Sequence, residues 1–422
     1  MAICRQSLRG VCGKGRSGLQ HRLRRFAALV LAVCTLAGCA GWGASETAAA
    51  SAVPAVSPAP APTGAGDPLS GMTLREKVGQ LFIVRPDALD PAQTQDRIDD
   101  ADAAGVTALT DAMRETLETY PVGGVVLFGK NIESPAQLAA FTADLQEAGR
   151  LPMFIAVDEE GGAVARLANS PALSLPQYES AAAVGAEGPA AAREMARTIG
   201  GYLQGYGINL DFAPVADVNS NPDNPVIGAR AFSADPEMAA ACVSAAVQGF
   251  AEAGVLCCLK HFPGHGDTAA DSHDGAVTLD KTLEELRSCE LRPFASGIAA
   301  GAPLVMVGHI SAPSAVPPEE ANLPASLSPG LIDGLLRQKL GFTGLVVTDS
   351  LAMKAITENF TSGEAAVRAL QAGADLLLMP ADLAEAFDAV TEAVETGAIP
   401  EAALNAKVAR ILAAKQSFAA VP

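Results

Sequence analysis

The chain has 422 residues, of which 49% are hydrophobic and 18% are charged, and its formal net charge is −18. This composition is typical of a globular protein with a sizeable hydrophobic core. The excess of acidic residues argues against binding of nucleic acid or anionic lipid through a basic face, and it decides nothing about neutral substrates.

The first 38 residues have the pattern of an export signal. They carry seven basic residues and no acidic one, followed by an apolar segment, residues 26–37, that is too short to span a bilayer as a helix. The segment Leu36-Ala37-Gly38-Cys39 resembles the processing box of bacterial lipoproteins. This resemblance implies cleavage before Cys39 and attachment of a lipid to it. An ordinary secretory signal with an incidental cysteine is the alternative, and both interpretations predict an exported protein.

Residues 39–68 have the composition of a disordered linker. They are rich in Ala, Pro, Ser and Gly, and they include the run Pro58-Ala59-Pro60-Ala61-Pro62. Such a segment cannot bury a core and is typical of an extended tether. Together with a lipid on Cys39, it would hold the folded part, residues 69–422, at a membrane surface and outside the cytoplasm.

Four cysteines follow the linker: Cys242, Cys257, Cys258 and Cys289. They lack the paired spacing of a zinc site. Cys257 and Cys258 are neighbours in an apolar run, so as strand residues they point to opposite faces. We interpret these cysteines as small buried hydrophobic residues, and a disulfide involving Cys242 or Cys289 stays open as an alternative.

Short apolar runs alternate with longer segments of helical periodicity from Met72 onward. The apolar runs are residues 79–84, 123–128, 153–158, 208–215, 255–261, 304–309, 344–349 and 374–379. The helical candidates include residues 135–148, 189–205, 236–254, 282–301, 328–340 and 363–373. Continuous apolar runs are typical of parallel strands covered by helices. The pattern predicts an α/β fold with a single (β/α)8 barrel, with a doubly wound open sheet as the alternative.

Polar residues follow many of the predicted strands directly or within a few residues. They are Asp158, Asp217, Lys260, His261, His309 and Asp349. In (β/α)8 barrels the chemistry takes place at the carboxyl ends of the strands, so these positions are candidates for a site. The simpler explanation is that strands end wherever polar residues begin.

Two of these segments carry groups suited to catalysis. Asp349 ends the run 344–349, where a carboxylate suits a nucleophile or a metal ligand; its alternative role is to cap the next helix. Beyond the run 255–261, in the segment that follows it, Asp271 lies two residues before His273. A carboxylate at that spacing can fix the tautomer of an imidazole, which can then give and recover a proton. A surface histidine beside an aspartate is the ordinary interpretation of such a pair.

Several segments, taken together and in order, resemble glycoside hydrolase family 3, in particular its bacterial β-N-acetylglucosaminidase branch. They are residues 72–80 (MTLREKVGQ), 157–162 (VDEEGG), 211–219 (DFAPVADVN), 221–230 (NPDNPVIGAR), 260–268 (KHFPGHGDT), 271–273 (DSH) and 348–353 (TDSLAM). The resemblance covers about residues 69–414. One departure is Gly161-Gly162-Ala163-Val164, where the family often has Gly-Gly-Arg-Val.

The resemblance implies roles for eight residues. Asp349 matches the nucleophile that forms a covalent glycosyl-enzyme, and His273 matches the acid/base residue, oriented by Asp271. Residues that hold the hydroxyl groups of the terminal sugar are matched by Asp158, Arg166, Arg230, Lys260 and His261. Retaining glycosidases commonly use a second carboxyl group as proton donor. The Asp-His pair of this branch therefore narrows the implied substrate to N-acetylglucosamine. No catalytic role is assigned to His265, Asp267 or His309.

The expected protein is thus an exported, lipid-anchored β-N-acetylhexosaminidase with a carbohydrate substrate. It would release terminal β-linked N-acetylglucosamine from peptidoglycan fragments or chitooligosaccharides, without a metal or organic cofactor and without a nucleic-acid partner. A β-glycoside phosphorylase, a metal-dependent amidohydrolase barrel and a non-catalytic sugar-binding lipoprotein are the alternatives. The natural aglycone, the membrane leaflet and the oligomeric state stay open.

Overall fold

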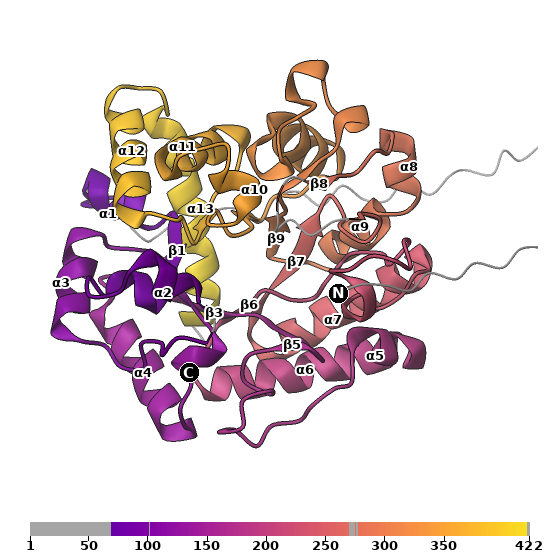
Figure 1. Ribbon diagram of the computed structural model, residues 1–422, viewed down its shortest axis with the longest axis horizontal. Helices are drawn as coiled ribbons and strands as arrows, with labels where there is room; N and C mark the ends of the chain where they lie inside the picture. The colour runs from indigo at the N-terminus through magenta and orange to yellow at the C-terminus, as the bar shows by residue number, and fades with distance from the viewer. Residues whose placement is uncertain (1–68, 101, 270–274, 276, 420–422) are drawn as a thin grey trace, which may run out of the picture. The chain divides into compact units, whose positions relative to one another are not determined.

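Strands alternate with helices throughout the part of the chain that the structure describes (Figure 1). The computed structural model describes residues 69–100, 102–269, 275 and 277–419, which belong to one unit. The predicted leader and linker, with Cys39, lie outside the described residues, as do Asp271 and His273. Within the described range, no helix is both long and apolar enough to cross a membrane.

Eight strands form one sheet in which all neighbouring strands are parallel. In sheet order they are β11 (Leu345–Thr348), β9 (Leu304–Val307), β7 (Leu256–Phe262), β6 (Leu210–Asp211), β3 (Phe154–Val157), β2 (Gly124–Leu127), β1 (Phe82–Val84) and β12 (Leu377–Leu378). The two edges meet through a bridge between Val347 and Leu376, so the sheet is nearly closed. Each strand falls on one of the predicted apolar runs. The predicted (β/α)8 barrel is confirmed, and the open-sheet alternative is wrong.

Helices surround these strands on the outside (Figure 1). They are α1 (Leu74–Gly79), α2 (Gln95–Asp99), α3 (Asp111–Thr119), α4 (Pro135–Ala148), α5 (Ala181–Glu187), α6 (Pro189–Gly205), α7 (Pro236–Ala253), α8 (Leu283–Ser288), α9 (Leu291–Ala299), α10 (Lys354–Thr357), α11 (Ser362–Ala372), α12 (Leu383–Glu395) and α13 (Glu401–Ala419).

Shorter elements complete the barrel. Six 3-10 turns are η1 (Pro86–Leu89), η2 (Gly129–Asn131), η3 (Gly228–Arg230), η4 (Pro313–Ala315), η5 (Pro318–Glu320) and η6 (Ala325–Leu327), and η7 (Gly330–Lys339) is a π-helix. Strands β4 (Glu159–Gly161) and β5 (Val164–Ala165) form an antiparallel hairpin, and β8 (Val277–Thr278) pairs with β10 (Ile310–Ser311).

Local sequence signals explain where the long helices begin and end. Helix α7 starts at Pro236, after Asp235, whose side chain accepts a hydrogen bond from the backbone of Glu237, and it ends at Gly254 with a φ of 73°. The predicted single helix over residues 282–301 is wrong, because the chain forms α8 and α9 instead. Pro293 has no amide hydrogen and clashes with the carbonyl one turn earlier, so it fits only in the first turn of a new helix.

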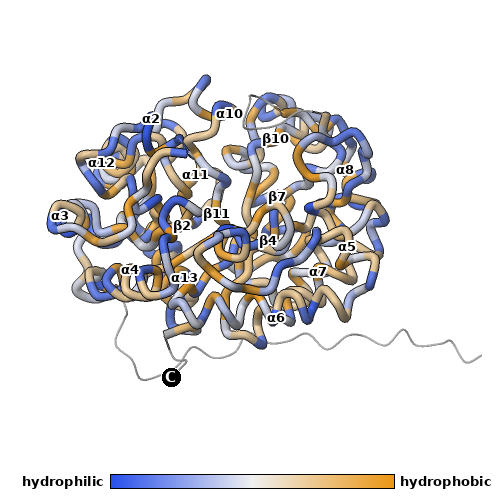
Figure 2. Tube along the Cα trace, turned by 60° about the horizontal axis from the view of Figure 1, so that its bottom comes forward, coloured by the Kyte–Doolittle hydropathy of each residue, from blue (hydrophilic) through white to orange (hydrophobic). Residues whose placement is uncertain are grey.

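The core lies between the strands and the helices. Figure 2 shows hydrophilic residues mainly on outer helices such as α3 and α4, and hydrophobic residues in the interior. Among the described cysteines, Cys242, Cys257 and Cys258 are buried, Cys289 is half-buried, and all four are free thiols. The disulfide alternative is therefore wrong, and the interpretation as buried hydrophobic residues holds for the first three.

A buried lysine fills the amino-terminal end of the barrel. Lys415 of α13 donates hydrogen bonds to the side chain of Gln80 and to the carbonyl of Gly123, each over 2.7 Å, and its ammonium lies 5.0 Å from the ring centre of Phe154. Gln80 lies two residues before β1, and Gly123 directly precedes β2. Burial lowers the pKa of Lys415 to about 7. No carboxylate is among these contacts, so the charged form of Lys415 is destabilised in the folded protein.

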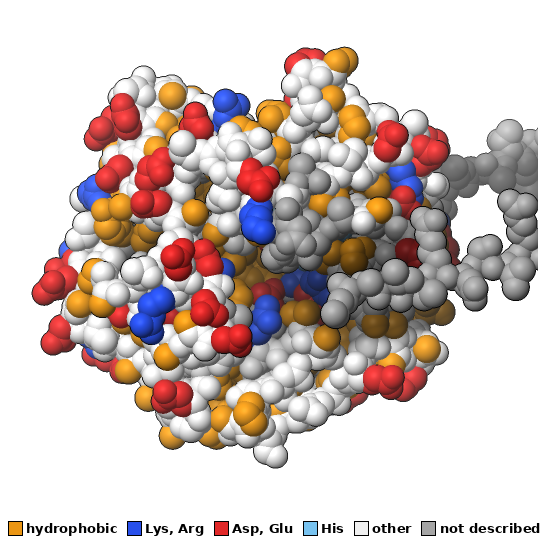
Figure 3. Space-filling view, in the orientation of Figure 1, with side chains coloured by type: hydrophobic (Ala, Val, Ile, Leu, Met, Phe, Trp, Pro, Cys, Tyr) orange, Lys and Arg blue, Asp and Glu red, His pale blue; other side chains and the backbone are white. Residues whose placement is uncertain are grey.

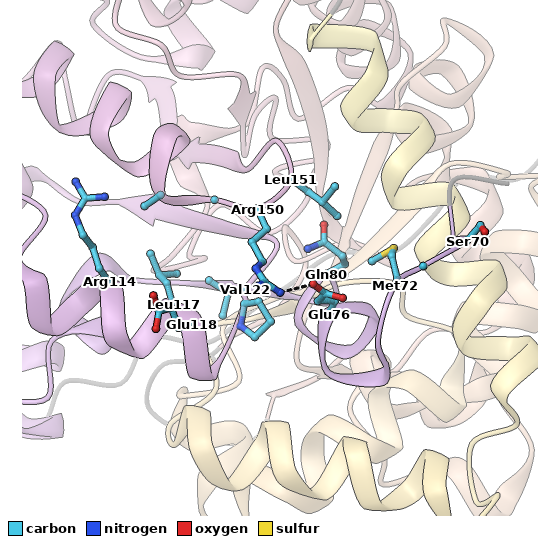
Figure 4. A pocket seen from close by; sticks show the side chains of 14 residues that line it. Ser70, Met72, Glu76, Gln80, Arg114, Leu117, Glu118, Val122, Arg150 and Leu151 are labelled. Carbon is cyan, nitrogen blue, oxygen red and sulfur yellow. Dashed lines mark hydrogen bonds and ion pairs between the residues drawn. The ribbon is translucent and has the colours of Figure 1, made fainter. Parts of the chain in front are cut away.

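A pocket of about 420 Å³ lies beside this lysine, also lined by Gln80 (Figure 4). The side chains of Glu76 and Arg150 face each other across it and form an ion pair. None of the predicted site residues lines this pocket. In a (β/α)8 barrel this end serves stability.

The stability of the protein should depend on pH through Lys415. Its pKa is lower in the folded than in the unfolded chain, so the unfolded chain binds more protons between about pH 7 and pH 10, and stability rises with pH there. From pH 7 to 9.5, the free energy of unfolding of wild type should rise by on the order of 2 kcal/mol more than that of Lys415→Met. Urea denaturation at both pH values measures it. Lys339→Met, at an exposed lysine, is the control, and an unchanged difference would contradict the assignment.

Candidate active site

The carboxyl ends of the strands surround a pocket of about 620 Å³. Figure 3 shows basic and acidic side chains close together in a hollow on the face it presents. Every predicted site residue that the structure describes lines the pocket: Asp158, Arg166, Arg230, Lys260, His261 and Asp349. The structure thus brings these six residues together in one pocket, and their roles stay predictions.

Four charged side chains at one side of the pocket form a chain of ion pairs. Lys260, on β7, lies 2.6 Å from Asp158 and 2.7 Å from Glu160. Glu160, on β4, also accepts two hydrogen bonds from the guanidinium of Arg230, over 2.7 and 2.8 Å. We call Asp158, Glu160, Arg230 and Lys260 the charged cluster. Its members alternate in sign, so each charge is next to an opposite one.

The charged cluster stays ionised although it is buried. Burial raises the pKa of Asp158 and Glu160, but Lys260 and the neighbouring arginines outweigh this effect and hold both pKa values below the usual range, that of Glu160 at about 2. Burial likewise opposes the charge of Lys260, and the two carboxylates raise its pKa above the ordinary value. At neutral pH the pocket therefore presents fixed donors on Lys260 and Arg230 and a fixed acceptor on Asp158.

Arg166 lies at the rim of the pocket. One of its terminal nitrogens is 3.6 Å from Asp158, and its guanidinium stacks over the ring of Phe128 at 5.2 Å. Its side chain is 32% exposed, against 3% for Lys260. Arg166 is thus placed where it can contact both a ligand in the pocket and solvent.

His261 is held in one orientation by Asp217. The Nδ1 atom of His261 lies 2.8 Å from one carboxylate oxygen of Asp217, and the other oxygen accepts from the backbone amides of His261 and His265. Burial, together with Arg230, lowers the pKa of His261 well below its usual value. Because an ionised carboxylate can only accept, Nδ1 carries the proton and Nε2 is left as an acceptor. His261 therefore adds a neutral acceptor to the site.

Asp349 follows β11 and lines the same pocket. Its amide donates to the carbonyl of Val307 over 2.9 Å, and its side chain accepts from the amide of Ser350 over 2.7 Å. The next helix, α10, has Met353 at its cap position and no side-chain cap. The alternative that Asp349 caps that helix is therefore wrong.

The sequence interpretation missed two residues of the site. Glu160 links Lys260 to Arg230. The sequence signal that could have identified it is its position two residues after Asp158. Asp217 was noted only as a polar residue after a strand. His309, to which no catalytic role was assigned, has structural contacts. Its ring nitrogens form hydrogen bonds with the side chain of Ser326 and with the carbonyl of Ser350, each over 2.8 Å.

Two of the predicted catalytic residues, Asp271 and His273, lie outside the described residues, so the acid/base assignment remains a prediction. Described neighbours in sequence do form contacts: Lys281 lies 3.1 Å from Asp267 and 2.5 Å from Glu290. The pair between Lys281 and Asp267 joins the chain before and after the predicted acid/base segment.

The fold and the pocket together define a (β/α)8 enzyme whose site is lined by fixed polar groups at the strand ends. A comparison with known families agrees, since the profile described as "Glycosyl hydrolase family 3 N terminal domain" matches residues 73–414. The chain belongs to glycosyl hydrolase family 3.

Individual relatives narrow the class of enzyme. β-Hexosaminidase A of Pseudoalteromonas piscicida is 37% identical over 334 residues, 73% of this chain but 55% of that protein. β-Hexosaminidase LpqI of Mycobacterium tuberculosis is 34% identical over 415 residues, 92% of this chain and 95% of that protein. The structure of a family 3 β-N-acetylglucosaminidase from Paenibacillus superposes with a TM-score of 0.73 at 41% identity, covering 82% of this chain and 63% of that one. These relatives are β-hexosaminidases or a β-N-acetylglucosaminidase, and the chain spans only 55% and 63% of the length of the Pseudoalteromonas and Paenibacillus proteins.

Removing the charge of Glu160 should destabilise the protein strongly. Glu160→Gln keeps the shape but leaves Arg230 without its carboxylate, and breaking a buried pair costs about 3–5 kcal/mol. Asp388→Asn is the control, because it breaks the exposed pair with Arg75, which contributes little. Urea denaturation of both variants measures the difference. Equal stability of the two variants would show that the charged cluster does not depend on Glu160.

Proposed function

We propose that the protein is a retaining β-N-acetylhexosaminidase that hydrolyses terminal β-linked N-acetylglucosamine. The observation that carries this proposal is the position of Asp349, in one pocket with the charged cluster. Asp349 follows β11 and Asp158 follows β3. Around the barrel these two strands are separated by β12, β1 and β2, so they lie on opposite sides of the pocket. A sugar that spans the pocket would thus have a carboxylate at one end and fixed polar groups at the other.

The charged cluster would bind the hydroxyl groups of the terminal sugar. A hydroxyl group both donates and accepts a hydrogen bond. Lys260 and Arg230 offer donors, while Asp158 and the Nε2 atom of His261 offer acceptors. Because these groups are held by each other before a substrate arrives, little reorganisation is needed when the sugar binds.

The reaction would proceed in two steps. Asp349 attacks the anomeric carbon while the bond to the aglycone oxygen breaks, and His273, oriented by Asp271, gives its proton to that oxygen. Water then attacks the same carbon, His273 takes up a proton, and Asp349 is released. The resemblance of residues 271–273 and 348–353 to the family signature supports these roles.

The substrate class rests on two supports. Segment 271–273 resembles the Asp-Ser-His of the N-acetylglucosaminidase branch, and the Paenibacillus structure, at 41% identity, is that of a β-N-acetylglucosaminidase. Peptidoglycan fragments and chitooligosaccharides carry such terminal sugars, and we propose them as the natural substrates.

Removal of the nucleophile should abolish turnover. For Asp349→Asn we expect kcat on a p-nitrophenyl N-acetyl-β-glucosaminide to fall about a thousandfold or more, because no covalent intermediate can form. Asp223→Asn, the same change at an exposed aspartate, is the control. Full activity of Asp349→Asn would contradict the assignment of Asp349 as the nucleophile.

The same assay separates hydrolysis from phosphorolysis. A hydrolase, as proposed here, releases free sugar at the same rate with and without phosphate. A phosphorylase would release sugar 1-phosphate at a rate that depends on phosphate.

We also propose that the enzyme is exported and anchored by a lipid on Cys39. Its support is the sequence of residues 1–39 alone. In a bacterial host that processes lipoproteins, wild-type protein should partition into the detergent phase of a Triton X-114 extraction, and Cys39→Ala should move to the aqueous phase. Equal partitioning of the two proteins would contradict the anchor.

A further inference from the structure

The chain on either side of the predicted acid/base segment is anchored to the barrel, and the two anchored ends meet at Lys281. The ammonium group of Lys281 lies 3.1 Å from a carboxylate oxygen of Asp267 and 2.5 Å from one of Glu290. Asp267 lies four residues before Asp271, and Lys281 lies eight residues after His273. The proposed reaction gives no role to the three ion-paired side chains.

The chain before the segment is held by side chains from the loop between β6 and η3. The buried side chain of Asn224 donates to the carbonyls of His265 and Thr268, over 2.8 and 2.9 Å. The hydroxyl group of Ser220 donates to Asp267 over 2.8 Å. These contacts fix the position of the chain relative to the barrel as far as Thr268.

The chain after the segment is held by the strand pair β8–β10. Val277 and Thr278 lie opposite Ile310 and Ser311, and the amide of Leu279 donates to the carbonyl of Ser311 over 2.8 Å. Strand β10 comes shortly after β9, the neighbour of β7 in the sheet. The chain thus leaves the barrel after β7 and is next held beside β9.

Glu290 fixes Lys281 to the body of the barrel. Its side chain is fully buried, and a side-chain carbon added at Gly264, in the turn after β7, would lie 2.7 Å from its Cβ atom. Burial opposes the charge of Lys281, but Glu290 and Asp267 outweigh this effect and raise its pKa above the ordinary value. A buried carboxylate that loses its cation is strongly destabilised, so Lys281 stays beside Glu290 in the folded protein.

Lys281 therefore links the two ends of the segment to each other. Because Glu290 holds the ammonium group in place, the second ion pair, to Asp267, limits how far positions 267 and 281 can separate. A segment with fixed ends has fewer conformations than one with free ends. Proton transfer needs the acid within hydrogen-bond distance of the leaving oxygen, and such positioning contributes strongly to rate.

We propose that Lys281 is a positioning residue for the acid/base step. By binding Asp267, it fixes the two ends of the segment that carries Asp271 and His273. The inference rests on the proposed function and extends it to a group that does not touch the sugar. Loss of the Lys281–Asp267 pair should impair proton donation to the aglycone oxygen, while attack by the nucleophile and sugar binding by the charged cluster are unchanged.

Two aryl N-acetyl-β-glucosaminides test the inference, one with 2,4-dinitrophenol and one with p-methoxyphenol as the aglycone. Dinitrophenolate leaves without a proton, whereas p-methoxyphenolate needs one, and kcat/KM covers the steps up to aglycone release. For Lys281→Met we expect kcat/KM on the p-methoxyphenyl substrate to fall about tenfold or more, and kcat/KM on the dinitrophenyl substrate to stay within about twofold. A loss of structure alone would lower both values equally.

A second variant keeps the test valid if Lys281→Met does not fold. Asp267→Asn leaves the pair between Lys281 and Glu290 intact and removes a partly exposed ion pair, which contributes little to stability. It should show the same split between the two substrates. Lys339→Met and Asp223→Asn, the same changes at exposed residues, are the controls and should leave both kcat/KM values unchanged.

His273→Ala separates this inference from the proposed function. If His273→Ala lowers kcat/KM equally on both substrates, the acid/base assignment fails, and the positioning role fails with it. If His273→Ala shows the split, but a folded Lys281→Met or Asp267→Asn does not, the acid/base assignment stands and the positioning role of Lys281 is overturned.

Discussion

The site depends on the burial of Lys260 between two carboxylates. An ammonium group taken out of water without partners is strongly destabilised, and in a protein it would lose its proton instead. Lys260 keeps its proton because Asp158 and Glu160 lie 2.6 and 2.7 Å away. Asp158 directly follows β3 and Glu160 lies on β4, about a hundred residues earlier in the chain. The charged form of Lys260 is therefore stable only in the folded barrel, where the carboxyl ends of β3 and β7 lie at the same end of the sheet. Folding of the barrel and assembly of the site are thus one event.

The same constraint fixes the pattern of donors and acceptors that a sugar meets. Glu160 is satisfied by Lys260 and Arg230 together, so those two cations cannot separate without leaving a buried carboxylate unpaired. His261 follows Lys260 directly and is fixed in turn by Asp217, whose second oxygen holds the backbone. Burial raises the pKa of Asp217 to about 6, which leaves it ionised at neutral pH. Polar groups that are already held in place stabilise a bound transition state without first having to reorient.

The sequence predicted the barrel well because burial on both faces makes parallel strands continuously apolar, and that pattern is local. It also located Asp158, Lys260 and Asp349, since each directly follows or ends an apolar run. Glu160 was missed because its role requires the chain to turn back at Gly161 and Gly162, whose φ angles are 83° and 68°. Two adjacent glycines indicate a turn but not its direction. The break at Cys289 and Glu290, just before Pro293, was missed for the opposite reason: helical periodicity continues across it, and only the missing amide hydrogen of Pro293 reveals it.

The β4–β5 hairpin differs between its base and its tip. At its base, Glu159 accepts hydrogen bonds from the amides of Leu167 and Ala168, each over 2.8 Å, and Glu160 joins the charged cluster. At its tip, Ala163 is exposed and lines a pocket next to the catalytic one. The base is constrained by buried charges that tolerate little change, whereas the tip bears on no buried charge. A substitution at the tip therefore leaves the buried ion pairs of the charged cluster in place, whereas a substitution at the base breaks them.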